Sequence, residues 1–170
     1  ASQIEQISHI SWNGTGYRLF ADCRQLTSIG GTLNLTTTAS YLFYRCYVLS
    51  TLPTINIANS VTTASHIFAG ANAVSYVDAK TTIAKCTRVT DFSSAFRMKQ
   101  FASGQQISLT EMFSNNSVVT NLSHFLSQYN GGSEFPSVTN TISVVGTIPS
   151  TVTTTYWMME ELQSVTVQYN

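Results

Sequence analysis

The side chains that could do chemistry are few, and their spacing defines no catalytic centre. The three histidines, His9, His66 and His124, are scattered along the chain, and no Ser/His/acid set can be assembled around them. The adjacent acids Glu160 and Glu161 would diverge on a helix, so they would not act as an acid/base pair. The sequence contains no nucleophile elbow, zinc-protease motif or phosphate-binding loop. We therefore expect a protein that is not an enzyme and that uses no cofactor and no metal.

The three cysteines belong to a recurring spacing. An aromatic residue is followed by a small residue at the third position and by aliphatic residues at the sixth and ninth positions. The clearest copies are Phe20, Cys23, Leu26 and Ile29, then Phe43, Cys46, Leu49 and Leu52, and then Phe68, Ala71, Val74 and Val77. Cys86 fits the small-residue position of a later copy, and Phe113 begins another. This spacing predicts that these residues form the core.

The cysteine position allows three interpretations. Free cysteine is among the most buried residue types, which favours a ladder of packed thiols. A disulfide between Cys23 and Cys46 is the alternative in an oxidising environment. A metal site is disfavoured, because the spacing is wrong and no histidine pair lies nearby.

The phrase Phe-x-x-Cys-x-x-Leu-x-x-Leu, with Pro53 soon after it and a return rich in Thr, Ser and Asn, resembles the BspA-like leucine-rich repeats. That family occurs in bacterial surface proteins and in bacteriophage structural proteins. The resemblance covers residues 17–77 and continues more loosely to about residue 126. The return segments also match each other, as TTTASYLF at 36–43 and VTTASHIF at 61–68. Together these features predict an α+β repeat solenoid, a leucine-rich-repeat-like stack of about six short, irregular strand-plus-helical-turn units with capped ends.

The expected organisation is one domain in three parts. Residues 1–16 would form an N-terminal cap, 17–126 the leucine-rich-repeat-like units, and 127–170 degenerate units ending in a C-terminal cap strand. Val165, Val167 and Tyr169 alternate with polar residues, which is the signature of a strand. This strand would either close the solenoid or pair with a second copy of the chain as a homo-oligomer.

Composition limits the partners. Only 9% of the residues are charged, the net charge is zero and the pI is about 7. The sequence has no basic patch to neutralise phosphates, so we expect no nucleic-acid partner. It has no apolar run of the length that a membrane span needs. Serine and threonine supply most of the polar surface, which is typical of extracellular and virion proteins.

The expected function is non-catalytic binding or structural support at a surface. Tyrosine offers large contact area at low entropic cost, and the candidate binding residues are Tyr41, Tyr44, Tyr47, Tyr76 and Tyr129. The partner would be a protein or a glycan on a host or neighbouring virion surface. The family resemblance implies a bacteriophage virion component at the particle surface, such as a fibre, tail or capsid-surface protein. The alternative is a BspA-like bacterial adhesin, secreted or held at the cell surface.

Overall fold

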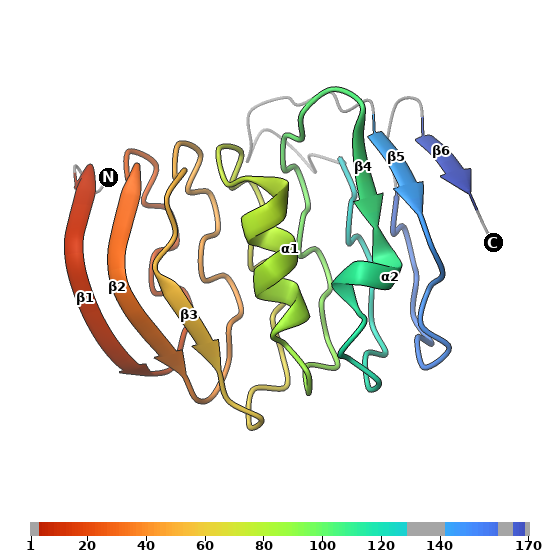
Figure 1. Ribbon diagram of the computed structural model, residues 1–170, viewed down its shortest axis with the longest axis horizontal. Coiled ribbons are helices and arrows are strands. Elements are labelled where there is room, and N and C mark those ends of the chain that lie inside the picture. The colour runs from red at the N-terminus through yellow and green to blue at the C-terminus, as the bar shows by residue number, and fades with distance from the viewer. Residues whose placement is uncertain (1–3, 129–141, 160–164, 169–170) are drawn as a thin grey trace.

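The computed structural model describes residues 4–128, 142–159 and 165–168 (Figure 1). The described residues contain six strands and two short helices. In chain order they are β1 (Gln6–Gly14), β2 (Ser28–Leu35), β3 (Thr54–Ile57), α1 (Tyr76–Ala84), β4 (Gln105–Ser108), α2 (Leu109–Met112), β5 (Ile142–Val145) and β6 (Val165–Gln168).

The strands form two parallel sheets, each of three strands. The first sheet has the order β1-β2-β3 and the second has the order β4-β5-β6. Within each sheet, consecutive strands pair directly, with Leu33 opposite Ile55 in the first and Ile107 opposite Val144 in the second. β1 and β6 therefore lie at the outer edges, and Figure 1 shows them at opposite ends of the molecule.

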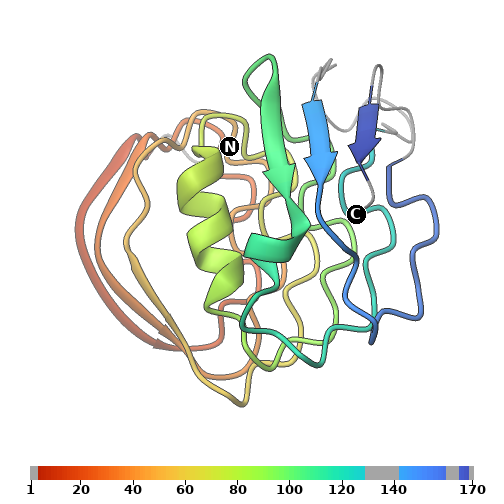
Figure 2. The same cartoon turned by 45° about the vertical axis from the view of Figure 1, so that its right-hand side comes forward.

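The expectation of an α+β repeat solenoid, one stack of about six strand-plus-helical-turn units, is wrong. The structure instead consists of two separate three-stranded parallel sheets, with α1 between the inner strands β3 and β4 and α2 directly after β4. Helix α1 occupies the place between β3 and β4 where a strand would have to join the sheets (Figures 1 and 2). The Ser75 side chain caps the start of this helix by accepting a hydrogen bond from the backbone N–H of Asp78 at 3.0 Å.

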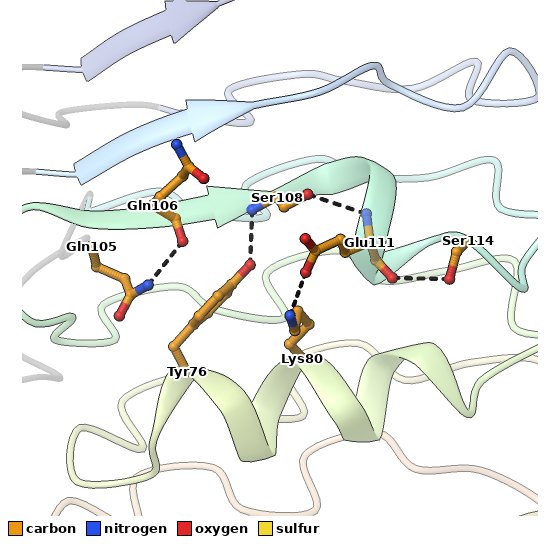
Figure 3. A network of polar contacts seen from close by, with 7 residues as sticks. All are labelled: Tyr76, Lys80, Gln105, Gln106, Ser108, Glu111 and Ser114. Atoms are coloured by element: carbon orange, nitrogen blue, oxygen red, sulfur yellow. Dashed lines mark hydrogen bonds and ion pairs between the residues drawn. The ribbon is translucent and has the colours of Figure 1, made fainter.

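Side chains of α1 and of its C-cap residue Lys85 contact the inner edges of both sheets. Lys85 Nζ donates to the carbonyl of Ile55 on β3 at 3.0 Å. On the other side, the hydroxyl of Tyr76 accepts from the backbone N–H of Ser108 on β4 at 2.8 Å, and Lys80 pairs with Glu111 of α2 (Figure 3). Polar groups on a strand edge attract other chains unless they are covered. Helix α1 therefore lies between the two sheets, and its side chains and C-cap occupy polar groups on both inner edges.

Turn segments form a second layer behind the sheets and α1 (Figure 2). Phenylalanines from successive segments stack in this layer, with ring centroids 5.8 Å apart for Phe20 and Phe43, 5.7 Å for Phe43 and Phe68, and 5.7 Å for Phe68 and Phe96. Phe43 and Phe68 have no exposed surface. The core therefore lies between the two layers and is centred on these rings.

The remaining positions of the recurring spacing are mostly buried. Leu26, Leu49 and Cys86 have no exposed surface, and Val74 and Phe113 are 3% and 4% exposed. Cys23 and Leu52 are half-buried, and Val77 is 64% exposed on α1. The spacing placed Val77 in the core because it treated residues 74–77 as extended, whereas the helix turns this side chain outward.

The cysteines are free thiols, and the position they share holds side chains that donate to backbone carbonyls. The Cys46 thiol is fully buried and donates to the Phe20 carbonyl at 3.0 Å, whereas Cys23, in the first turn segment, is only half-buried. In later segments Lys99 and Asn116 take the same position. Lys99 Nζ donates to the Ala71 carbonyl at 2.8 Å, and Asn116 Nδ2 donates to the Cys86 carbonyl at 2.6 Å.

Substitution of Cys46 tests this position. Cys46→Ala is expected to cost about 1–2 kcal/mol of the free energy of unfolding, because it removes a weak hydrogen bond and leaves a small cavity. Cys46→Asp is expected to cost roughly 3–5 kcal/mol, since it places an uncompensated charge in the core. Urea denaturation at neutral pH measures both variants. Small, equal losses would show that position 46 is open to water.

Candidate binding surface on the turn layer

Six residues of the turn layer share one backbone conformation and form a row. All are non-glycine residues in the left-handed region, with φ between 53° and 59°. We call them the turn row: Arg18, Tyr41, His66, Ser94, His124 and Trp157. Up to His124, the N–H of each member donates to the carbonyl of the residue just before the next member, as in Arg18 to Ser40 at 3.1 Å and Tyr41 to Ser65 at 2.9 Å. These backbone hydrogen bonds thus fix the Cα position from which each side chain projects.

Aromatic rings and a guanidinium pack against one another along the first half of this row. The Tyr41 ring stacks on His66, with centroids 4.4 Å apart and planes 7° apart. The Arg18 guanidinium also lies over the Tyr41 ring, 5.2 Å from its centroid. Tyr17 and Tyr44 meet Tyr41 edge-on, at 6.1 Å and 5.3 Å. Such contacts hold the side chains in place before any partner binds.

Two further arginines extend the cluster along its side. Arg45 lies 5.1 Å from the Tyr44 centroid, and Arg24 lies 5.7 Å from that of Tyr47. Both guanidiniums pair with Asp22 Oδ1, at 3.2 Å for Arg45 and 3.3 Å for Arg24. We call the whole cluster the tyrosine–arginine patch: Tyr17, Arg18, Asp22, Arg24, Tyr41, Tyr44, Arg45, Tyr47 and His66.

The patch is positively charged although the whole chain is neutral. The patch contains three arginines and one carboxylate, that of Asp22, which pairs with Arg24 and Arg45, so a cationic excess remains at neutral pH. Tyr17 is 56% exposed and Arg18 is exposed beside it, so this excess lies at an accessible surface. The arrangement suits a partner with apolar rings or sugar faces and some negative charge.

The five predicted tyrosines have different environments. Tyr41 and Tyr47 are half-buried in the patch, and Tyr44 is 7% exposed and forms its floor. Tyr76 lies on α1 instead, where its hydroxyl is engaged by Ser108 (Figure 3). Tyr129 lies outside the described residues, as do the acids Glu160 and Glu161.

Sequence reasoning missed Tyr17, Arg18 and His66 as members of the surface. A signal for His66 was present, because the phrases TTTASYLF and VTTASHIF align it with Tyr41. Equivalent positions in hydrogen-bonded neighbouring segments lie side by side, so this alignment places the imidazole next to the phenol ring. No comparable phrase marks Tyr17 or Arg18.

Two hollows flank α1, away from the patch. One, of about 400 Å³, lies between β3 and α1 and is lined by Asp78, Thr82 and Lys85, among others. The other, of about 250 Å³, includes Tyr76 and Lys99 in its wall. Both lysines donate to backbone carbonyls of the protein itself. The patch is therefore the better candidate for contact with a partner.

No family model, curated protein or solved structure matches the chain. Within the part of the chain that the structure describes, no three His, Cys, Asp or Glu side chains gather closely enough to hold a metal ion. None of the described helices combines the length and the apolar character needed to cross a membrane.

Proposed function

We propose that this protein is a non-catalytic binding and structural module of a bacteriophage particle, displayed at the particle surface as part of a fibre, tail or capsid. In this role the tyrosine–arginine patch contacts the host surface or a neighbouring virion protein. The observation that carries the proposal is the patch, in which exposed Tyr17, Arg18 and Arg24 adjoin half-buried, prearranged rings around Tyr41 on an otherwise weakly charged protein.

The composition of the patch supports a binding role. Tyrosine and arginine are enriched among the residues that dominate binding energy at protein interfaces. The side chains of Tyr41 and His66 are already stacked, and their backbones are tied to the next segments. A partner therefore has little side-chain entropy to remove on binding, which favours affinity.

The proposed location draws on composition and on the local phrase around Cys46. A surface rich in serine and threonine with few charges suits a particle exposed to the medium. The phrase is similar to one found in phage structural proteins, but the fold expected from it is wrong. The patch, and not the fold, is thus the main support for a binding function.

Peptide mass spectrometry tests the location. Purified phage particles and, separately, washed envelopes of the host bacterium would be digested and searched for peptides of this chain. We expect peptides in the particles, in a fixed ratio to other structural proteins. Peptides confined to the envelope would contradict a virion location and favour the adhesin, and absence from both fractions would contradict a surface role altogether.

Substitutions in the patch test the binding role. Tyr41→Ser and Arg18→Ser are each expected to reduce binding roughly tenfold or more, because truncation of a central interface residue costs about 2 kcal/mol. The measurement is retention of labelled protein by intact host cells and by particles that lack this chain. Val77→Ser, at an exposed position on α1, is the matched control and should bind as the wild type does. Equal binding by all variants would show that the patch is not the contact surface.

A further inference from the structure

The two ends of the turn row carry different backbone groups, an N–H donor at Trp157 and a carbonyl acceptor just before Arg18. His124, the fifth member, donates its N–H to the Tyr156 carbonyl at 2.9 Å. The N–H of Trp157, the last member, has no acceptor among the described residues. At the other end, the Tyr17 carbonyl precedes Arg18 and receives no hydrogen bond from the described part of the chain.

The neighbouring hydrogen bonds have the same polarity. Leu126 donates its N–H to the Met158 carbonyl at 2.8 Å, in the same direction as His124. At the first segment, Phe20 donates to the Leu42 carbonyl at 3.1 Å, again toward the following segment. One end of the turn layer therefore presents N–H groups and the opposite end presents carbonyl groups. The two ends are complementary, and neither is complementary to itself.

Large rings are exposed at these same two ends. Tyr156 is 64% exposed and Trp157 is 47% exposed, and their rings meet edge-on with centroids 4.8 Å apart. Tyr17 is 56% exposed beside Arg18. These three residues are half of the large hydrophobic residues that are exposed in the described chain, the others being Ile4, Val48 and Val77. Exposed aromatic groups of this kind mark interaction surfaces.

The sheet layer presents compatible edges at the same ends. β1 is the outer strand of the first sheet and β6 the outer strand of the second, and every strand pair is parallel. Figures 1 and 2 show the two strands at opposite ends of the molecule, with α1 between the sheets. A second copy placed end to end would extend the parallel pairing, which is how strand edges commonly recruit another chain.

We propose that copies of this chain associate head to tail, with the Trp157 end of one copy against the Arg18 end of the next. The Trp157 N–H donates to the Tyr17 carbonyl of the next copy, as His124 donates to Tyr156 within one chain. The Trp157 ring covers the outer side of Arg18 of the next copy, whose guanidinium already lies over Tyr41. This inference does not depend on the proposed binding partner, although it covers Tyr17 and Arg18, so in an assembly only the copy with a free Arg18 end presents that part of the patch.

Such an interface is heterologous, so each added copy leaves a free end. An interface between two different surfaces produces an open series of assemblies unless the rotation happens to close a ring. The zero net charge favours association, since no overall repulsion opposes it.

Sedimentation velocity from low micromolar to millimolar protein tests the proposal. We expect the average mass to rise with concentration from the 18.6 kDa of one chain through dimers to larger species. Trp157→Asp should remain a single chain throughout, and Val77→Asp, at an exposed position away from both ends, should associate as the wild type does. A wild-type protein that stays monomeric at millimolar concentration would overturn the proposal.

Mixing two variants distinguishes this interface from a symmetric one. Trp157→Asp damages one end, and Arg18→Asp, at an exposed left-handed position that aspartate tolerates, damages the other. Each variant alone should be monomeric, whereas an equimolar mixture should form a dimer of one copy of each and no larger species. A symmetric interface through β6 would leave Arg18→Asp fully dimeric by itself, and that result would overturn the head-to-tail arrangement. Circular dichroism spectra that match the wild type would show that both variants are folded.

Discussion

Phe68→Ala is expected to lower the free energy of unfolding by roughly 3–5 kcal/mol, the range measured for large truncations in protein cores. Phe68 has no exposed surface, and both faces of its ring are covered by other phenylalanines. Phe43 lies 5.7 Å away on one side with an interplanar angle of 20°, and Phe96 lies 5.7 Å away on the other with an angle of 7°. Removal of the Phe68 ring leaves a cavity between Phe43 and Phe96 that these two rings cannot fill.

Urea denaturation followed by circular dichroism measures this loss. Val77→Ala is the control, because Val77 is 64% exposed on α1 and alanine suits a helix, so a change within about 0.5 kcal/mol is expected. Phe43→Ala should resemble Phe68→Ala, since Phe43 is equally buried between Phe20 and Phe68. A loss below about 1 kcal/mol in either phenylalanine variant would mean that the rings do not form the core.

The second large effect is expected from Lys99 and depends on pH. Lys99 is 1% exposed, and its Nζ donates to the carbonyls of Ala71 and Val74 at 2.8 Å and 2.6 Å. Burial lowers the pKa of this lysine from 10.5 to about 7. The folded protein therefore releases the proton in a pH range where the unfolded chain still holds it.

The direction of the effect follows from proton linkage. Below about pH 7 both states are protonated at Lys99, and the burial penalty is present in full. Between about pH 7 and 10.5 the unfolded state holds more protons, so the free energy of unfolding rises with pH by up to about 1.4 kcal/mol per pH unit. From pH 7 to 9 the rise should be roughly 2 kcal/mol.

Lys99→Met isolates this contribution. The variant removes the titrating group but keeps most of the buried side-chain volume, so its stability should lack the rise that wild type shows between about pH 7 and 9. Lys80→Met should keep the wild-type rise, because the ion pair with Glu111 raises the pKa of Lys80 and so removes it from this range. Denaturation curves at several pH values provide the comparison. Parallel pH profiles for wild type and Lys99→Met would show that Lys99 keeps its proton in the folded state.

The apolar spacing locates much of the core but does not determine the architecture. Phe43, Cys46 and Leu49 are buried where the spacing places them, because a side chain that recurs at one position in neighbouring segments meets its counterparts. The same reasoning fails at Val77, since a single capping residue, Ser75, converts the next segment into α1. A capping hydrogen bond of this kind is a local feature, and apolar spacing contains no information about it.

The candidate surface was only partly predictable for a related reason. Tyr41, Tyr44 and Tyr47 lie within seven residues of one another, and this concentration of tyrosine indicates a candidate binding surface. Arg18 and His66 reach Tyr41 from segments 23 and 25 residues away, so their contacts depend on how the segments align. The assignment of residues 1–16, 17–126 and 127–170 to separate parts of the domain remains a prediction.

The left-handed backbone of the turn row has a consequence for how this protein can diversify. At Arg18 and Trp157, the two ends of the row, the main chain holds the left-handed conformation and the side chain is exposed. Asparagine, aspartate and glycine fit this conformation with little or no strain. Exchange of residues at these two exposed positions can therefore change what the surface recognises and leave the scaffold intact. An evolving lineage, or a designed library, can vary specificity at these positions independently of folding.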